Sequence, residues 1–202
     1  MLKRIAGDPS LWLLIIFNLY LIWYYEQHPS SFKTLVWLYW LQSVMIGLLN
    51  ALDIFMLKNP DPQSMEIDGK PMDGRLQSKG CLGLFFLVHY GGFHLAYAIF
   101  LLVQIRGPFD SNIFRLGAGL IFIELTLSFI KRRNWEKQQK VVNVGRIFFS
   151  PYLRIIPMHL MILGPAFLGW SHISIFLWLK TATDVLMHIF INRSQQPAAA
   201  IS

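Results

Sequence analysis

Six long apolar stretches constrain this chain more than any other feature of its sequence. Each is close to the roughly 20 residues that a helix needs to cross the hydrocarbon core of a bilayer. None has the period-two alternation of a membrane β-barrel strand, so helices are expected. The sequence therefore predicts a single all-α domain over residues 1–202, a bundle of six transmembrane helices that ends in a mobile tail at 192–202. We place the spans at about 9–25, 33–57, 81–105, 113–131, 151–170 and 172–191.

The composition excludes most other classes of protein. Apolar residues make up 54% of the chain and charged residues 14%, against about 25% charged in an ordinary soluble domain. A soluble surface cannot be covered by so few charges. The single cysteine, Cys81, excludes a secreted fold held by disulfides. The net charge is +7, but the basic residues lie between apolar runs, so the expected partner is the lipid bilayer and not nucleic acid.

The distribution of Lys and Arg predicts the orientation. If the N-terminus is cytoplasmic, 13 of the 18 basic residues fall in inner segments, three in outer segments and two within spans. This bias is a strong positive-inside signal, which places both termini in the cytoplasm and the protein in the cell inner membrane as a multi-pass protein. The first span follows Lys3 and Arg4 and lacks a small-residue cleavage site, so we interpret it as a retained signal anchor.

Two inner loops differ in character. Residues 58–80 have balanced charge and many turn formers, which is typical of a solvated loop. Residues 131–150 carry six basic residues and one acid, Glu136, together with Trp135. We expect this second segment to lie on anionic lipid headgroups, with a soluble partner as the alternative. A homo-oligomer is also compatible with the sequence.

Ionisable and amide side chains inside the spans fall at one depth. Each ionisable group there costs about 2.5–3.5 kcal/mol, so each needs a partner or a function. Counted at about 1.5 Å per residue, they lie about 5–12 Å from the cytoplasmic ends of their helices. We therefore predict a polar layer in the cytoplasmic half of the bundle, formed by Asn50, Asp53, His89, Glu124, His159, Asp184 and His188.

The last span has the most regular polar pattern. Lys180, Asp184 and His188 recur every four residues and so lie along one stripe of a helix. Asp184 can pair with Lys180 on one side and hold the His188 ring on the other. A carboxylate in that position commonly orients a histidine that binds a metal.

The third span has two histidines that point in different directions. His89 and His94 are five residues apart, about 140° around a helix, so only one can face a shared centre. The sequence favours His89 for the site and His94 for packing. Gly91 and Gly92 lie between them and predict a close approach by another helix.

The leading functional hypothesis is a metal-dependent membrane enzyme. Imidazole nitrogens and carboxylate oxygens suit a transition metal such as zinc or iron. The candidate catalytic residues are Glu124, Asp184 and Lys180. The candidate metal ligands are His89, His159, His188, Glu124 and Asp184. No HExxH motif or paired HxxxH cluster is present, and no other cofactor-binding residue is indicated.

Three alternatives remain open. Histidines on two spans, with His89 and His159 at one depth, could bind haem b in an electron-transfer protein. Buried acids and Lys180 could relay protons in a proton-coupled transporter. The same polar layer could be the structural core of a non-catalytic membrane scaffold. An absorption spectrum with elemental analysis separates the metal and haem hypotheses from the other two.

Three motifs resemble those of an uncharacterised family of bacterial multipass membrane proteins, a domain of unknown function. They are His89-Tyr-Gly-Gly-Phe93, Pro157-Met-His-Leu160 and the Lys180-Thr-x-x-Asp184-x-x-x-His188 pattern. The family's third-span motif continues to a further histidine where this chain has Tyr97, so a four-histidine site is not implied. The resemblance implies a multipass helical fold and carries no activity.

The orientation predicts which loops a membrane-impermeant thiol reagent reaches in intact cells. Single cysteines at Ser111 and Ser64, each in a Cys81→Ala background, probe an outer and an inner segment respectively. We expect labelling at position 111 and none at position 64, because the reagent does not cross the bilayer. Labelling at 64 without labelling at 111 means that the orientation is inverted.

Overall fold

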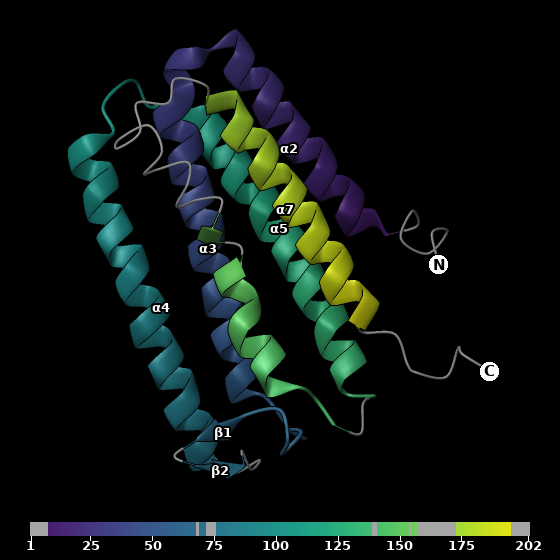
Figure 1. The fold of residues 1–202 in the computed structure, drawn as a ribbon. Coiled ribbons are helices and arrows are strands. Elements are labelled where there is room, and N and C mark those ends of the chain that lie inside the picture. Colours follow the sequence, from purple (N-terminus) through teal and green to yellow (C-terminus); the bar gives the residue numbers. More distant parts are fainter. Residues whose placement is uncertain are drawn as a thin grey trace.

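The computed structural model describes residues 8–67, 69–71, 76–138, 141–153, 155–156 and 173–194. This part of the chain is predominantly helical (Figure 1). The helices are α2 (Pro9–Gln27), α3 (Phe32–Phe55), α4 (Leu76–Gln104), α5 (Ser111–Glu136) and α7 (Ile173–Ser194), with a short 3₁₀ turn, η1 (Pro29–Ser31). A further helical segment covers residues 144–153 and continues at 155–156.

Five of the six predicted spans are confirmed as helices, within a few residues of the expected ends. Of the predicted span at 151–170, only the first residues are described, and the helix that contains them begins earlier, at residue 144. Within the described residues, three helical stretches are long and apolar enough to cross a membrane, namely Pro29–Phe55, Gln77–Gln104 and Ser111–Glu136.

The helices lie along one another, with α3 near the middle (Figure 1). Helix α3 packs against α4 and α5, and α2 packs against α5 and α7. We call the end of the bundle at which α3 and α5 finish the lower end. Apolar side chains that are at most 2% exposed fill the interior, among them Leu21, Leu35, Leu38, Phe86 and Ile121.

The outer surface of the bundle is apolar too. On α4, Leu84, Val88, Leu95 and Leu102 are 61–70% exposed, and Phe122 and Ile123 on α5 are at least half exposed. Contiguous apolar exposure on this scale is unusual for a soluble monomer and is typical of surfaces that contact lipid or another protein.

Two helices begin at aspartate N-caps, which fix the ends of the bundle. The Asp8 carboxylate accepts a hydrogen bond from the Ser10 backbone N–H at 3.2 Å, and Pro9 occupies the first helical position, where its missing N–H costs nothing. The Asp110 carboxylate caps α5 in the same way and also accepts the Tyr24 hydroxyl at 2.8 Å.

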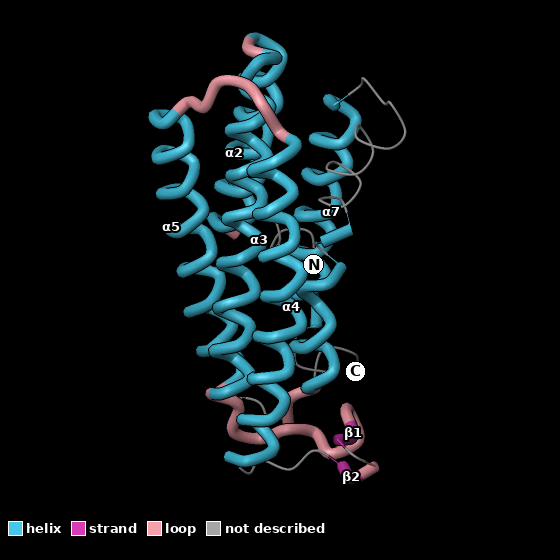
Figure 2. Tube along the Cα trace, turned by 90° about the vertical axis from the view of Figure 1, so that its left-hand side faces the viewer, coloured by secondary structure: helices cyan, strands magenta, loops and turns pink. Residues whose placement is uncertain are grey.

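The loops at the lower end contact each other. The loop after α3 contains a hairpin of β1 (Glu66–Ile67) and β2 (Lys70–Pro71), with Gly69 at φ 71° in its turn. This hairpin lies at the lower end of the bundle (Figure 2). Pro60 pairs with Val142 in a parallel bridge, which joins this loop to the segment after α5. The segment predicted as a solvated loop is thus partly ordered by backbone pairing.

Helices approach closely at Gly47, as also at Gly83 and Gly117, and the prediction for Gly91 and Gly92 was wrong. A Cβ atom on Gly47 would collide with the Tyr90 ring. Gly91 and Gly92 are exposed and have open space around them. The reason is rotational, because α4 turns the face with Tyr90 towards α3 and the two glycines away from it.

We predict that Gly47→Ala lowers the free energy of unfolding by about 1–3 kcal/mol, because the Tyr90 ring is buried and bonded to α3 and cannot move aside. Gly119→Ala is the matched control, since nothing lies within 4 Å of a Cβ at that position. Thermal melting of both variants in detergent tests this. Equal melting temperatures for the two variants would contradict the close packing of α3 against α4 at Gly47.

Candidate functional site

In the part of the chain that the structure describes, buried charges gather in three clusters that each join two or three helices. The Lys180 cluster contains Lys180, Asp184, Asn18 and Gln42. The Asp8 cluster contains Asp8, Ser10, Lys131 and His188. The Asp53 cluster contains Asp53, Arg132, Arg133 and Glu136.

In the Lys180 cluster, one ammonium group is held by three helices. Its Nζ lies 2.6 Å from an Asp184 carboxylate oxygen on α7, and donates to the Asn18 side-chain oxygen on α2 at 3.1 Å and to that of Gln42 on α3 at 2.6 Å. Two of the three ammonium N–H donors are thus bonded to amide oxygens, and Asp184 supplies the opposite charge at ion-pair distance. Nζ also lies 4.2 Å from the centre of the Tyr39 ring, at cation–π distance.

This cluster lies within the apolar bundle. Lys180 is 6% exposed, Asp184 4%, Gln42 4% and Asn18 0%. Removing one partner of a buried ion pair is strongly destabilising, by about 3–5 kcal/mol, because the other charge is left without compensation. The cluster therefore holds α2, α3 and α7 in one arrangement as long as Asp184 stays charged.

In the Asp8 cluster, the carboxylate that caps α2 also pairs with basic side chains of two other helices. One oxygen of the Asp8 carboxylate accepts from Ser10 Oγ at 2.8 Å. The other lies 2.5 Å from Lys131 Nζ on α5 and 3.1 Å from His188 Nε2 on α7. Asp8 and His188 are buried, whereas half of the Lys131 side chain is exposed. The cluster thus connects the interior of the bundle to its surface.

The pKa of Asp8 is shifted by opposing effects. Burial raises the pKa, whereas the hydrogen bonds from Lys131, Ser10 and His188 together with the Lys131 charge lower it by more. The net result is a pKa well below the usual value for an aspartate, so this carboxylate stays charged at neutral pH.

The Asp53 cluster joins the lower ends of α3 and α5. Arg132 Nε donates to the Asp53 carboxylate at 2.6 Å, and Arg133 Nη1 lies 4.0 Å from the other oxygen. Arg133 also pairs with Glu136 and donates from Nη2 to the Met56 backbone oxygen at 3.1 Å. Asp53 is 0% exposed, so its charge depends on these two guanidinium groups.

The predicted stripe on α7 is buried. Lys180, Asp184 and His188 all face the interior, at most 6% exposed, and the Lys180–Asp184 pair expected from the spacing is confirmed. With a rise of about 1.5 Å per residue, the stripe covers about 12 Å along the helix. Its His188 end belongs to the Asp8 cluster and its Lys180 end to the Lys180 cluster.

Glu124 on α5 is buried close to Gln42 of the Lys180 cluster. It is 6% exposed and accepts a hydrogen bond from Ser128 Oγ at 3.0 Å. Glu124 and Gln42 both line a cavity of about 10 Å³. The Lys180 cluster and Glu124 are therefore neighbours, with Gln42 between them.

On α4 the buried histidine is His94, the predicted packing residue, whereas His89 does not face the interior as expected. His89 is exposed, with its Nδ1 2.9 Å from the Tyr152 hydroxyl and its ring stacked on Phe85. His94 is 3% exposed, with Nε2 2.8 Å from Ser43 Oγ and Nδ1 2.9 Å from the Tyr90 backbone oxygen. The depth of a residue in the bundle can be counted from its position in the sequence. The side of α4 that faces the interior depends on how α4 is rotated against α3, which the count does not show.

The described residues do not bring the predicted metal ligands together. Among them, no three His, Cys, Asp or Glu side chains are grouped closely enough to hold a metal ion. His89 lies beside Tyr152, His188 beside Asp8, and Asp184 beside Lys180. His159 lies outside the described residues. The five-residue metal site thus stays a prediction, without support from the described part of the chain.

Several partners were missed from the sequence. Asp8 was not singled out, although Asp-Pro before an apolar run is a helix-start signature and therefore a detectable signal. Asn18 and Gln42 are polar residues inside apolar runs and could have been found by the same depth count as Asp184. The Ser43–His94 contact has no comparable signal, because it depends on how α3 and α4 meet.

The model of a family of unknown function (DUF6498) matches residues 1–200. The chain belongs to this family. No curated protein and no solved structure matches it. Membership in the family assigns no activity, so a function must be argued from the clusters themselves.

We predict that the Asp8 charge stabilises the fold above about pH 4 and that this contribution is lost in acid. Because the folded pKa lies below the unfolded value of about 3.9, protonation on acidification favours the unfolded chain. Asp8→Asn keeps a good N-cap but removes the charge, so it should lower stability by about 2 kcal/mol near pH 7.

Melting of the wild-type protein and of Asp8→Asn between pH 7 and pH 3 tests this prediction. The difference between the two proteins should stay constant down to about pH 5 and then shrink. A difference that is unchanged at pH 3 would show that the Asp8 charge does not contribute in this way.

Proposed function

We propose that this chain is a multi-pass inner-membrane protein with six spans and both ends in the cytoplasm. Support comes from three helices long and apolar enough to cross a bilayer, and from the apolar side chains exposed on α4 and α5. Helices α2 and α7, of 19 and 22 residues, pack alongside these. The bias of basic residues towards one side supports the orientation, with the lower end in the cytoplasm.

We further propose that the protein is a proton-coupled transporter in which the α7 stripe carries the proton. The observation behind this proposal is the row of buried side chains on α7, namely Lys180, Asp184 and His188. Asp8 contacts both His188 and the half-exposed Lys131, and so connects this row to the surface. Buried ionisable groups that pair with one another inside spans are typical of proton relays.

The proposed path begins at the lower end. A proton enters beside Lys131 and Asp8 and reaches the His188 ring, whose Nε2 lies 3.1 Å from the Asp8 carboxylate. Imidazole suits this step because it gains and loses protons near neutral pH. Asp184 is one helical turn further along the same face and is the next acceptor. Lys180, the ion-pair partner of Asp184, is the last described group on this path.

Protonation of Asp184 would couple proton uptake to helix movement. The neutral carboxylic acid leaves the Lys180 ammonium without its counter-ion in a region of low dielectric, which is costly. Asn18 of α2 and Gln42 of α3 hold the same ammonium. The charge state of one side chain therefore changes the preferred arrangement of three helices, which is how a proton can drive an alternation between two states.

Proton coupling is favoured over the other functional hypotheses. A catalytic metal site needs several side chains around one centre with an open position, whereas these groups pair with separate partners. A haem site needs two histidines facing one gap, and His89 faces outwards beside Tyr152. A scaffold remains the alternative, and it predicts that charge-neutral variants change stability without changing proton movement.

The test is proton flux into liposomes that contain the purified protein and an entrapped pH-sensitive dye, driven by a potassium diffusion potential. We expect flux above that of protein-free liposomes, and a reduction of at least tenfold in Asp184→Asn. The amide keeps the size of the side chain but cannot accept and release the proton.

Glu26→Gln is the matched control, because it makes the same chemical change at an exposed position on α2. Its flux should equal that of the wild type. Wild-type flux no greater than that of empty liposomes at either sign of the potential would refute the proposed proton pathway, as would full flux in a folded Asp184→Asn.

A further inference from the structure

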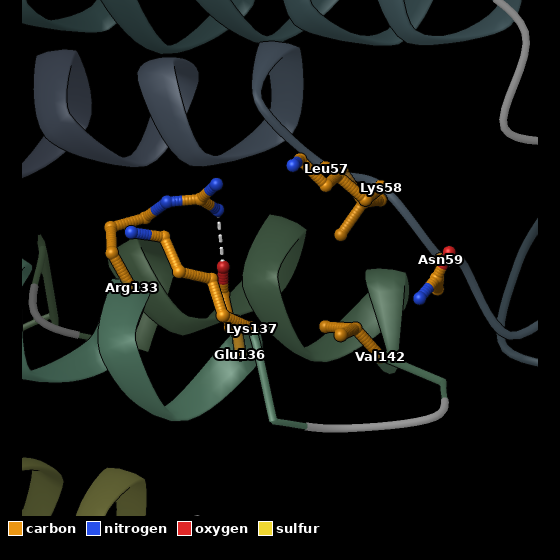
Figure 3. A pocket seen from close by; sticks show the side chains of 7 residues that line it. All are labelled: Leu57, Lys58, Asn59, Arg133, Glu136, Lys137 and Val142. Atoms are coloured by element: carbon orange, nitrogen blue, oxygen red, sulfur yellow. Dashed lines mark hydrogen bonds and ion pairs between the residues drawn. The ribbon is translucent and has the colours of Figure 1, made fainter.

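A pocket of about 160 Å³ lies at the lower end of the bundle, outside the α7 stripe. It is formed where α3 ends, where α5 ends and where the segment after α5 pairs with the loop after α3. Figure 3 shows Arg133 and Glu136 on one side of it and Lys58, Asn59 and Val142 on the other.

The charges that line this pocket are mainly positive. Lys58, Arg133 and Lys137 contribute three cations and Glu136 one anion, which is already paired with Arg133. Lys58 and Lys137 are exposed, and within the described part of the chain neither has an ion-pair partner. The excess positive charge therefore belongs to two side chains that are free to bind an anion.

Arg133 gives the pocket a rigid wall. The residue is 9% exposed, with Nη1 paired to Glu136 and Nη2 bonded to the Met56 backbone oxygen at 3.1 Å. Its Nε is buried without a hydrogen-bond partner in the described structure. A buried donor that lacks an acceptor is costly, and a bound oxyanion or water is one way in which such a group is satisfied.

The position of the pocket limits what can occupy it. It lies at the ends of α3 and α5, both of which are apolar enough to cross a membrane. Leu52 on α3, the C-cap residue Met56 and Ile130 on α5 are 47–50% exposed near the ends of these two helices. A cationic pocket next to an apolar helix surface suits an amphiphile, whose anionic head would bind at the lysines while its apolar chains lie along the helices.

We infer that this pocket binds the phosphate group of an anionic phospholipid headgroup, with Lys58 and Lys137 as its cationic ligands and Arg133 as its buried wall. This inference rests on the proposed membrane placement but not on proton movement. It also narrows the lipid contact expected over residues 131–150, because Arg132 and Arg133 pair with Asp53 and Glu136 inside the protein.

Native mass spectrometry of the detergent-solubilised full chain, titrated with phosphatidylglycerol or phosphatidylcholine, tests the inference. We expect tighter binding of phosphatidylglycerol, and a loss of about 10- to 30-fold in its affinity in Lys58→Ala/Lys137→Ala. The charge-conserving Lys58→Arg/Lys137→Arg variant should bind like the wild type. Arg106→Ala/Arg115→Ala, which removes two exposed cations elsewhere, is the matched control.

The lipid titration tests the lipid site separately from the proton-flux assay. Equal affinity for the two lipids, or wild-type affinity in the lysine-to-alanine double variant, overturns the inference. Displacement of phosphatidylglycerol by millimolar inorganic phosphate overturns its lipid part and identifies a site for free phosphate. Retained lipid binding without proton flux would contradict only the transport proposal.

Discussion

The buried Lys180 ammonium is the group on which the rest of the arrangement depends. An ammonium inside an apolar bundle must be neutralised and hydrogen-bonded, or the helices around it will not stay together. Asp184 supplies the opposite charge from the same helix, and Asn18 and Gln42 supply two amide acceptors from α2 and α3. Lys180 of α7 thereby requires both α2 and α3 as neighbours.

The same requirement explains the lower end of the bundle. Asp8 and Asp53 are buried acids at α2 and α3, and the consecutive residues Lys131 and Arg132 of α5 neutralise one each. Helix α5 therefore connects α2 and α3, because its adjacent residues Lys131 and Arg132 point towards different helices. Lys131, Arg132 and Arg133, three of the six basic residues that predicted a headgroup-binding segment, pair with acids of the protein itself. Of the cations that line the adjacent pocket, Lys58 and Lys137 are the two without an ion-pair partner among the described residues.

Features set by position along a helix could be predicted from the sequence, and features set by helix rotation could not. The lengths of the apolar runs predicted α2, α3, α4, α5 and α7, and the four-residue spacing predicted the Lys180–Asp184 pair. The same counting placed His89 and His188 in one layer of the bundle but did not show that α4 turns His89 outwards and His94 towards Ser43. Partners on separate helices, such as Asp8 with His188, require knowledge of which helices are neighbours.

The most direct test of the proposed proton path replaces the central ion pair by apolar side chains of similar volume, in Lys180→Met/Asp184→Leu. Apolar replacement of a whole buried pair is often close to neutral for stability, so the double variant separates folding from proton movement. The decisive measurement is its proton flux in liposomes beside its melting temperature. We predict a folded protein whose flux falls to the level of empty liposomes. A folded double variant with wild-type flux would show that the stripe is structural and that protons, if they move, take another route.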